Sequence, residues 1–509
     1  MNMNQKPKVL VFSTDNNKYI FDNVSGNVFH YSDEIMFIIN NFFRLLKDDI
    51  IEELVNKFGL EKRKCSNLYL YIENLINNGC FYNEMAVAEV DCREEALKTP
   101  MSQLILVLTE QCNLRCKYCI YSEHYPSVIG YSNKSMDFET AKRAIDQYMQ
   151  LYNEKQKYGY RKKAIISFYG GEPFLKFDVI KQVIKYCREK GYEVRYYVTT
   201  NGTIMNEEII EYIVNNDFIV TFSVDGDKEQ HDRNRVFAGN KGTFDSVLDN
   251  IERLQNYKRK RGIEQLITFN CTYDHYSDLS KIIDFFVKNY EKFDPFNVMF
   301  GPVNKLDTTY YDYCKEMNDK GIIKESSNTA GESYKHLLNK LIETAGNNDA
   351  ETKILNSFFA SLFLIKKRPK GLINLHSNAC MPSNKIAVSP DGDYYVCERI
   401  NQKFKIGDIN SGINWERCSE LLNKYMKVLS ENCEDCNLSR LCDSCYIHFV
   451  KDENNLEFNS EFCKEKKSIL PKTLSILYSL LEHNPKMFEI AFNNDIQEKN
   501  IIEFYQVMK

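Results

Sequence analysis

Three closely spaced cysteines are the residues of this sequence best suited to chemistry. Cys112, Cys116 and Cys119 follow the apolar run 104–108, which predicts a buried strand, so their thiols belong to a loop at a strand end. Thiolates are soft ligands that suit iron-sulfur clusters, Zn(II) and Cu(I). Three cysteines leave one iron of a four-iron cluster open, whereas a structural zinc site uses four closed ligands. The spacing therefore favours a cluster that can bind a small molecule.

The pattern Cys112-x3-Cys116-x-Tyr118-Cys119 resembles the signature of the radical S-adenosylmethionine (radical SAM) superfamily. In that family the open iron chelates the amino and carboxylate groups of S-adenosyl-L-methionine (SAM), and one electron cleaves SAM to a 5′-deoxyadenosyl radical. The resemblance implies a 4Fe-4S cluster and SAM as cofactors. Tyr118, the aromatic residue before the third cysteine, belongs to the same pattern.

A second group of cysteines lies towards the carboxyl terminus. Its seven members are Cys380, Cys397, Cys433, Cys436, Cys442, Cys445 and Cys463. Two predicted strands joined by a Pro-Asp-Gly turn within 386–396 bring Cys380 and Cys397 near one another. The spacing alone fits a pair of structural zinc sites as well as it fits iron. Next to the radical SAM signature, the pattern resembles the SPASM extension, which implies two auxiliary 4Fe-4S clusters.

The SPASM resemblance also implies which cysteines share a cluster. The outer cluster would take Cys433, Cys436, Cys442 and Cys463, and the inner cluster Cys380, Cys397 and Cys445. Some family members carry another cysteine shortly after the position of Cys380, and this sequence has none before Cys397. The inner cluster therefore either keeps an open iron or takes Cys418 as its fourth ligand.

Glu398 is a candidate catalytic residue because it directly follows Cys397. Sulfatase-maturating relatives carry at this position an aspartate proposed as general base, and a carboxylate beside a cluster could take a proton from a substrate cysteine. The alternative is a surface ion pair of Glu398 with Arg399 or Lys403.

The elements that must position these residues alternate between strand and helix patterns from Ser102 onward. Strands are predicted near 103–108, 164–169, 193–199, 218–224, 266–272 and 296–301. Six such units with right-handed crossovers predict an α/β fold, namely a partial (β/α)6 TIM-like barrel. In such barrels the chemistry lies at the carboxyl ends of the strands.

Two further strand ends carry residues that the radical SAM resemblance assigns to SAM binding. The turn Gly170-Gly171-Glu172 follows the second strand, and in the family this turn meets the amino group of SAM. A serine on the fourth strand and a following arginine contact the ribose or carboxylate, which implies Ser223 and Arg235. Without the resemblance, the alternative interpretations are a purely structural role for the glycine turn and a surface ion pair for Arg235.

Residues 1–95 are predicted to form a separate module. A strand, a hairpin and three helices predict a winged helix-turn-helix, with the elements near 9–12, 18–31, 34–46, 49–58 and 63–78. Ten Lys and Arg against fifteen Asp and Glu make the module acidic, which disfavours DNA binding. The module resembles the peptide-recognition element of enzymes that modify ribosomally made peptides. That resemblance implies that a leader peptide adds a strand along 27–31, beside the helix 63–78.

Composition indicates a soluble globular protein of several domains, with 509 residues, 43% hydrophobic and 27% charged residues and a net charge of -5. The start of the chain lacks the apolar core of a signal peptide, and no apolar run reaches about 18 residues. We therefore expect a cytoplasmic protein without membrane or nucleic-acid partners. The predicted organisation is a winged-helix module at 1–95 with a linker at 85–100, the barrel at 96–305, a helical bridge at 306–376, the SPASM domain at 377–465 and a helical tail at 466–509.

Together these features predict a radical SAM and SPASM maturase of a ribosomally made precursor peptide, served by a flavodoxin- or ferredoxin-type reductant. The favoured product is a crosslink in the form of a cysteine thioether, because an open auxiliary iron could hold the cysteine sulfur. One alternative is an anaerobic sulfatase-maturating enzyme, which forms formylglycine and would not need residues 1–95. The other is a zinc-stabilised winged-helix regulatory protein without chemistry.

Overall fold

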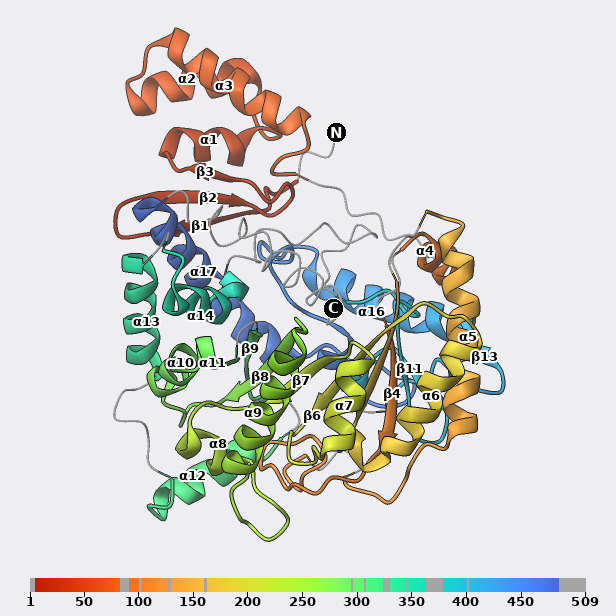
Figure 1. The fold of residues 1–509 in the computed structure, drawn as a ribbon. Coiled ribbons are helices and arrows are strands. Elements are labelled where there is room, and N and C mark those ends of the chain that lie inside the picture. Colours follow the sequence, from red (N-terminus) through yellow and green to blue (C-terminus); the bar gives the residue numbers. More distant parts are fainter. Residues whose placement is uncertain are drawn as a thin grey trace.

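Six parallel strands form the centre of the computed structural model (Figure 1). They pair in chain order as β4 (Gln103–Thr109), β5 (Ala164–Gly170), β6 (Val194–Thr200), β7 (Ile219–Ser223), β8 (Ile267–Tyr273) and β9 (Phe296–Pro302). Each strand end lies within one residue of its predicted position, so the predicted partial TIM-like barrel is confirmed. The structure describes residues 5–82, 91–99, 103–125, 130–159, 163–293, 296–305, 308–323, 330–344, 347–362, 379–400 and 402–484.

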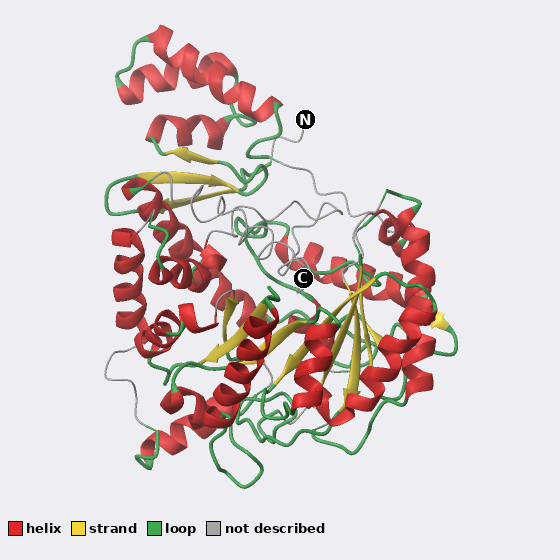
Figure 2. Cartoon of the chain, in the orientation of Figure 1, coloured by secondary structure: helices red, strands yellow, loops and turns green. Residues whose placement is uncertain are grey.

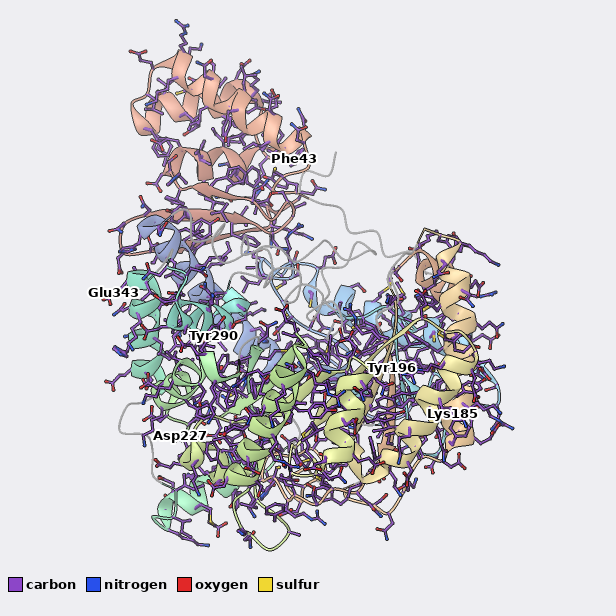
Figure 3. The ribbon with its side chains drawn as sticks, viewed as in Figure 1. Phe43, Lys185, Tyr196, Asp227, Tyr290 and Glu343 are labelled. Atoms are coloured by element: carbon purple, nitrogen blue, oxygen red, sulfur yellow. The ribbon has the colours of Figure 1, made fainter. Side chains whose placement is uncertain are left out.

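Helices pack along these strands (Figure 2). The longer ones are α5 (Phe138–Gln156), α6 (Phe177–Glu189), α7 (Glu207–Asn215), α9 (Phe244–Arg261) and α10 (Leu279–Lys288), and the short ones are η1 (Pro173–Lys176), α8 (Lys228–Asn234) and α11 (Tyr290–Phe293). Tyr196 of β6 is labelled in Figure 3. Phe168 of β5 is buried and stacks on the Tyr196 ring, with 6.3 Å between ring centroids. The neighbours of Phe168, Ser167 and Tyr169, point to the opposite face of the sheet and are only half-buried. The face of the sheet that carries Ser167 and Tyr169 is therefore less completely covered, and a functional site can lie on it.

The sheet continues past β4 into the cysteine-rich part of the chain. Strand β10 (Lys385–Val388) pairs with β4 in parallel, and β11 (Asp393–Tyr395), β12 (Gly407–Asp408) and β13 (Gly412–Ile413) follow in antiparallel order. The predicted hairpin within 386–396 is present as β10 and β11. Its junction with the barrel was not predicted, and it makes the barrel and the second cysteine group parts of one ten-stranded sheet.

The amino-terminal module has its own antiparallel sheet and hydrophobic core. Its elements are β1 (Val9–Ser13), β2 (Lys18–Asp22), β3 (Val28–His30), α1 (Asp33–Asn41), α2 (Lys47–Phe58) and α3 (Lys62–Asn77). Ser32 caps α1, with its hydroxyl accepting from the Ile35 amide, and α2 ends at Gly59 with positive φ. The strand order β1-β2-β3 leaves β3 at an edge of the sheet within the described residues. The assignment as a winged helix stays a prediction.

The other helices connect these parts, and one of them lies within the predicted linker. They are α4 (Cys92–Lys98), α12 (Tyr310–Asp319), α13 (Ala330–Thr344), α14 (Ala350–Phe358), α16 (Trp415–Cys433) and α17 (Ser460–His483), with the single turns η2 (Glu398–Ile400) and η3 (Tyr446–His448). The predicted linker at 85–100 contains the helix α4, which Asp91 caps and which buries Cys92 and Ala96, and the division of the chain into domains stays a prediction.

Helix α17 begins before the predicted tail at 466–509, and the end of that tail lies outside the described residues. The end of the predicted helical bridge at 306–376, to which α14 belongs, also lies outside the described residues. Across the described ranges, no helix combines the length and the apolar character needed to cross a membrane.

Candidate functional site

The thiols of Cys112, Cys116 and Cys119 lie together on the loop that follows β4. Burial raises the pKa of Cys112 to about 11 and the pKa of Cys116 to about 12, and Cys119 raises both pKa values further. The thiols therefore lie within electrostatic reach of one another. No group of three His, Cys, Asp or Glu side chains able to hold a single metal ion occurs among the described residues. Three soft donors on one loop fit the cubane cluster implied by the sequence, with one iron left for SAM.

Two arginines bring positive charge to this loop. Arg115 donates from one guanidinium nitrogen to the carbonyls of Cys112 and Leu114, both at 2.7 Å. A nitrogen of Arg235 lies 3.9 Å from Cys116 Sγ, and its charge lowers the pKa of that thiol against the larger effect of burial. These cations favour thiolates, the form that binds iron.

Asp225 is a buried residue of the site, and no role was predicted for it from the sequence. One of its oxygens accepts hydrogen bonds from the Tyr118 hydroxyl and from Arg235 Nε, the latter at 2.9 Å, and the other accepts from the Thr272 amide at 2.9 Å. The Arg235 guanidinium also lies over the Tyr118 ring, 5.4 Å from its centroid. Arg235 is 7% exposed, so the alternative of a surface ion pair is wrong. In the sequence, Asp225 was marked only by its position directly after the predicted strand 218–224, the observed β7.

The glycine turn after β5 packs directly on the backbone of the cysteine loop. The amide of Gly171 donates to the Thr109 carbonyl at 2.7 Å, and the amide of Glu172 donates to the Gln111 carbonyl at 2.9 Å. A Cβ atom on Gly171 would lie 2.1 Å from the Gln111 oxygen, and one on Gly170, whose φ is +143°, would lie 2.4 Å from the Thr109 oxygen. Both glycines are therefore required by this close approach.

Glu172 connects the turn after β5 to the loop after β6. Its carboxylate accepts hydrogen bonds from the Phe174 amide at 3.1 Å, the Thr200 hydroxyl at 2.9 Å and the Asn201 amide at 2.8 Å. The side chain is fully buried, and burial raises its pKa to about 7. Asn201 in turn lies beside the first cysteine, because its side-chain nitrogen Nδ2 is 3.6 Å from Cys112 Sγ. The expected contacts of Gly170, Gly171, Glu172, Ser223 and Arg235 with SAM stay predictions; Ser223 is half-buried at the end of β7.

The seven carboxyl-terminal cysteines form the two groups that the SPASM resemblance implied. Burial raises the pKa of Cys433 to about 12, with further increases from Cys436, Cys442 and Cys463, and we call these four the outer group. Burial likewise raises the pKa of Cys397 to about 12, with smaller contributions from Glu398, Cys380 and Cys445, and we call these three cysteines the inner group. Their roles as iron ligands stay predictions.

Cys418 has a different neighbour. It is buried in α16, and a hydrogen bond with Cys92 of α4 raises its pKa well above the usual value. Since the thiols of the inner group interact with one another, this pairing disfavours Cys418 as their fourth ligand.

Glu398 directly follows Cys397 of the inner group, and its charge adds to burial in raising the pKa of Tyr121, two residues after Cys119. Burial acts to raise its pKa, but the charges of Lys385 and Arg399 outweigh burial and leave the pKa below its usual value. Its oxygens are 3.8 Å from Lys385 Nζ and 3.8 Å from Arg399 Nε. The ion pair of Glu398 with Arg399, one of the two alternatives, is present. The expectation that this pair lies at the surface is wrong, because the Glu398 side chain is only 8% exposed. The charge of Glu398 adds to burial in raising the pKa of Tyr169, on the half-buried face of β5, to about 12.

Comparisons with known proteins give matches to the barrel and to most of the chain. The family model of the radical SAM superfamily matches residues 106–285. A cysteine-type anaerobic sulfatase-maturating enzyme of Clostridium novyi is 27% identical over 398 residues, covering 74% of this chain and 96% of that enzyme. The radical SAM cyclopropyl synthase TigE of Paramaledivibacter caminithermalis is 22% identical over 460 residues, covering 86% of this chain and 88% of that synthase. The solved structure "Native anSMEcpe with bound AdoMet and Cp18Cys peptide" shares the fold, with a TM-score of 0.50 and 20% identity over 78% of this chain and 100% of that one.

Proposed function

Because the chain belongs to the radical SAM superfamily of enzymes, we propose that it removes hydrogen from a ribosomally made precursor peptide and closes a crosslink in that peptide. The observation that carries the proposal is the buried carboxylate of Glu398, which directly follows Cys397 of the inner group and whose charge also acts on Tyr121, two residues after Cys119 of the cysteine loop. A base in this position can reach a substrate bound between the two groups.

The cofactor site is supported by the donors around the cysteine loop. When bound, SAM and its 4Fe-4S cluster supply the 5′-deoxyadenosyl radical. Cys112, Cys116 and Cys119 would hold that cluster, and the charges of Arg115 and Arg235 would offset the negative charge of their thiolates. Cys116 is buried and Cys112 and Cys119 are half-buried, which limits the access of water to the reacting groups.

The auxiliary groups support chemistry on the substrate. The inner and outer groups would hold two further 4Fe-4S clusters, which would supply an electron acceptor for the oxidation of a product radical. Lys385 and Arg399 hold Glu398 ionised, so its carboxylate can take a proton from a substrate thiol or amide. A thioether is the proposed bond, because the inner group offers three thiols and its remaining iron could bind a substrate cysteine.

A peptide substrate is supported by two features. The Clostridium novyi relative acts by its name on a sulfatase, and the similar solved structure contains a peptide. The edge strand β3 also offers amides to a leader peptide. The Asp22 amide donates to the Asn27 carbonyl and the Tyr31 amide donates to the Lys18 carbonyl, so by alternation the amides of Val28 and His30 point away from β2.

Sulfatase maturation is the second candidate, supported by the Clostridium novyi relative. The test incubates the anaerobically reconstituted full chain with SAM, dithionite and either a cysteine-containing sulfatase motif peptide or the short peptides encoded beside its gene. We expect about 12 irons per chain, from about 4 per cluster, and a mass loss of two hydrogens in one precursor peptide. Formylglycine in the motif peptide with no change in any precursor would establish the second candidate instead. Zinc with no iron would overturn both.

A further inference from the structure

The outer cysteine group is in contact with the amino-terminal module through one buried side chain. Asn23 follows β2 and is fully buried. Its amide nitrogen donates to the Cys436 carbonyl at 3.1 Å and to the Ser439 hydroxyl at 2.8 Å, and its oxygen accepts from the Arg440 amide at 2.9 Å. A single side chain of the module thus satisfies three polar groups of the loop between Cys436 and Cys442.

The module presents Asn23 on a rigid turn. Asp22 accepts hydrogen bonds from the amides of Val24, at 2.9 Å, and Phe81, at 3.1 Å, so the turn is fixed to the core of the module. Next to it, Arg440 donates to the Val24 carbonyl at 2.8 Å. Gly26, with φ of +80°, leaves room for this arginine, because a Cβ atom there would lie 2.4 Å from Arg440 Nε. The contact is therefore complementary in shape as well as in hydrogen bonding.

A second contact joins the module to α17, the helix that carries Cys463, the last cysteine of the outer group. Helix α17 holds Cys463 in its first turn and runs to the sheet of the module (Figure 1). At its far end Glu482 accepts hydrogen bonds from Thr14, at 2.8 Å, and from the Tyr19 hydroxyl, at 2.6 Å. The Tyr478 ring packs on the Tyr19 ring, with 4.9 Å between centroids.

We propose that Asn23 is a positioning residue of the outer cysteine group, so that the amino-terminal module completes this metal site in addition to any binding of peptide. Without Asn23, the Cys436 carbonyl and the Arg440 amide lose their buried partners, and the loop must open to water to satisfy them. The role of the loop as a cluster ligand rests on the proposed function, whereas its dependence on Asn23 does not.

The test uses the full chain with Asn23→Ala, and with Asn56→Ala, an exposed position of α2 in the same module, as matched control. In metal-free protein, iodoacetamide labelling of each cysteine is followed by mass spectrometry. We expect Asn23→Ala to speed labelling of Cys436 and Cys442 about tenfold, with the rate of Cys112 changed less than about twofold. Equal acceleration at Cys112 would indicate general unfolding and would overturn the inference, as would an unchanged rate at Cys436.

Iron content after anaerobic reconstitution is the second readout. We expect Asn23→Ala to lose about a third of its iron, from about 12 to about 8 per chain, while Asn56→Ala keeps it. Full iron content with Asn23→Ala would contradict the role in the metal site. Should the wild type bind no iron at the outer group, the proposed auxiliary cluster fails, and the labelling rates still decide whether Asn23 holds the loop.

Discussion

The hydroxyl of Tyr118, on the cysteine loop, donates a hydrogen bond to Asp225, at the end of a strand 107 residues further along the chain. The same carboxylate oxygen accepts from Arg235, so one acidic side chain holds both the aromatic residue of the signature and the cation beside Cys116. The cysteine loop is therefore positioned by β7 as well as by β4.

Asp225→Asn is expected to destabilise the metal-free protein by about 3–5 kcal/mol, because it leaves the charge of Arg235 buried without its partner. Urea denaturation measures the change. The matched control is Asp245→Asn, which removes one member of the exposed ion pair with Lys228 and should cost less than about 1 kcal/mol. Equal effects of the two substitutions would show that the buried pair has no special role.

Gly171→Ala is expected to displace the cysteine loop, because the added methyl group would overlap the Gln111 carbonyl. Reconstituted protein should lose the first cluster, about 4 of about 12 irons, together with reductive cleavage of SAM. Gly239→Ala is the control, since a Cβ atom there meets no atom within 4 Å. Normal iron content in Gly171→Ala would refute the requirement for close approach.

Stability of the metal-free protein is expected to fall as pH rises through the window set by Glu172. Burial raises the pKa of Glu172 from 4.5 to about 7, so between these values the folded state holds a proton that the unfolded state has released. Its contribution is therefore complete below pH 4.5 and is lost as pH approaches 7, on the order of 3 kcal/mol in total. Glu172→Gln should remove this slope when unfolding is measured at several pH values. An unchanged slope would exclude Glu172 as its source.

Glu398→Gln is expected to slow peptide modification about 100-fold while leaving reductive SAM cleavage without peptide within about twofold. The reason is that a neutral amide cannot accept the substrate proton, whereas the cysteine loop is untouched. Product formation is followed by mass spectrometry and 5′-deoxyadenosine by chromatography. Parallel losses in both assays would mean that Glu398 has a structural role only.

His30→Pro is expected to weaken binding of a matched precursor peptide at least about tenfold, because proline removes an amide that points away from β2. His30→Ala is the control, since it removes the same exposed side chain and keeps the amide. Fluorescence anisotropy of a labelled peptide gives both affinities. If the alanine variant binds as weakly as the proline variant, the strand edge is not the docking site.

Local sequence patterns were enough to predict the six barrel strands, because each is an apolar run between turns and ends where the chain leaves the sheet. The division of the carboxyl-terminal cysteines into two groups was expected from the SPASM resemblance and not from the spacing alone, and their roles as iron ligands stay predictions. The position of β10 beside β4 could not be predicted, since pairing between segments far apart in the sequence leaves no local trace. Asp225 and Asn23 were missed for a related reason, as each looks like an ordinary turn residue until its distant partners are known.

The pairing of β4 with β10 also bears on how the chain is synthesised. During translation β4 leaves the ribosome early, and its outer edge can be covered only after residues 385–388 have been made. Until then the nascent barrel exposes an apolar strand edge that can pair with other chains. We therefore expect that pairing with β10 protects the newly made protein from aggregation, and that truncation before β10 yields an insoluble product.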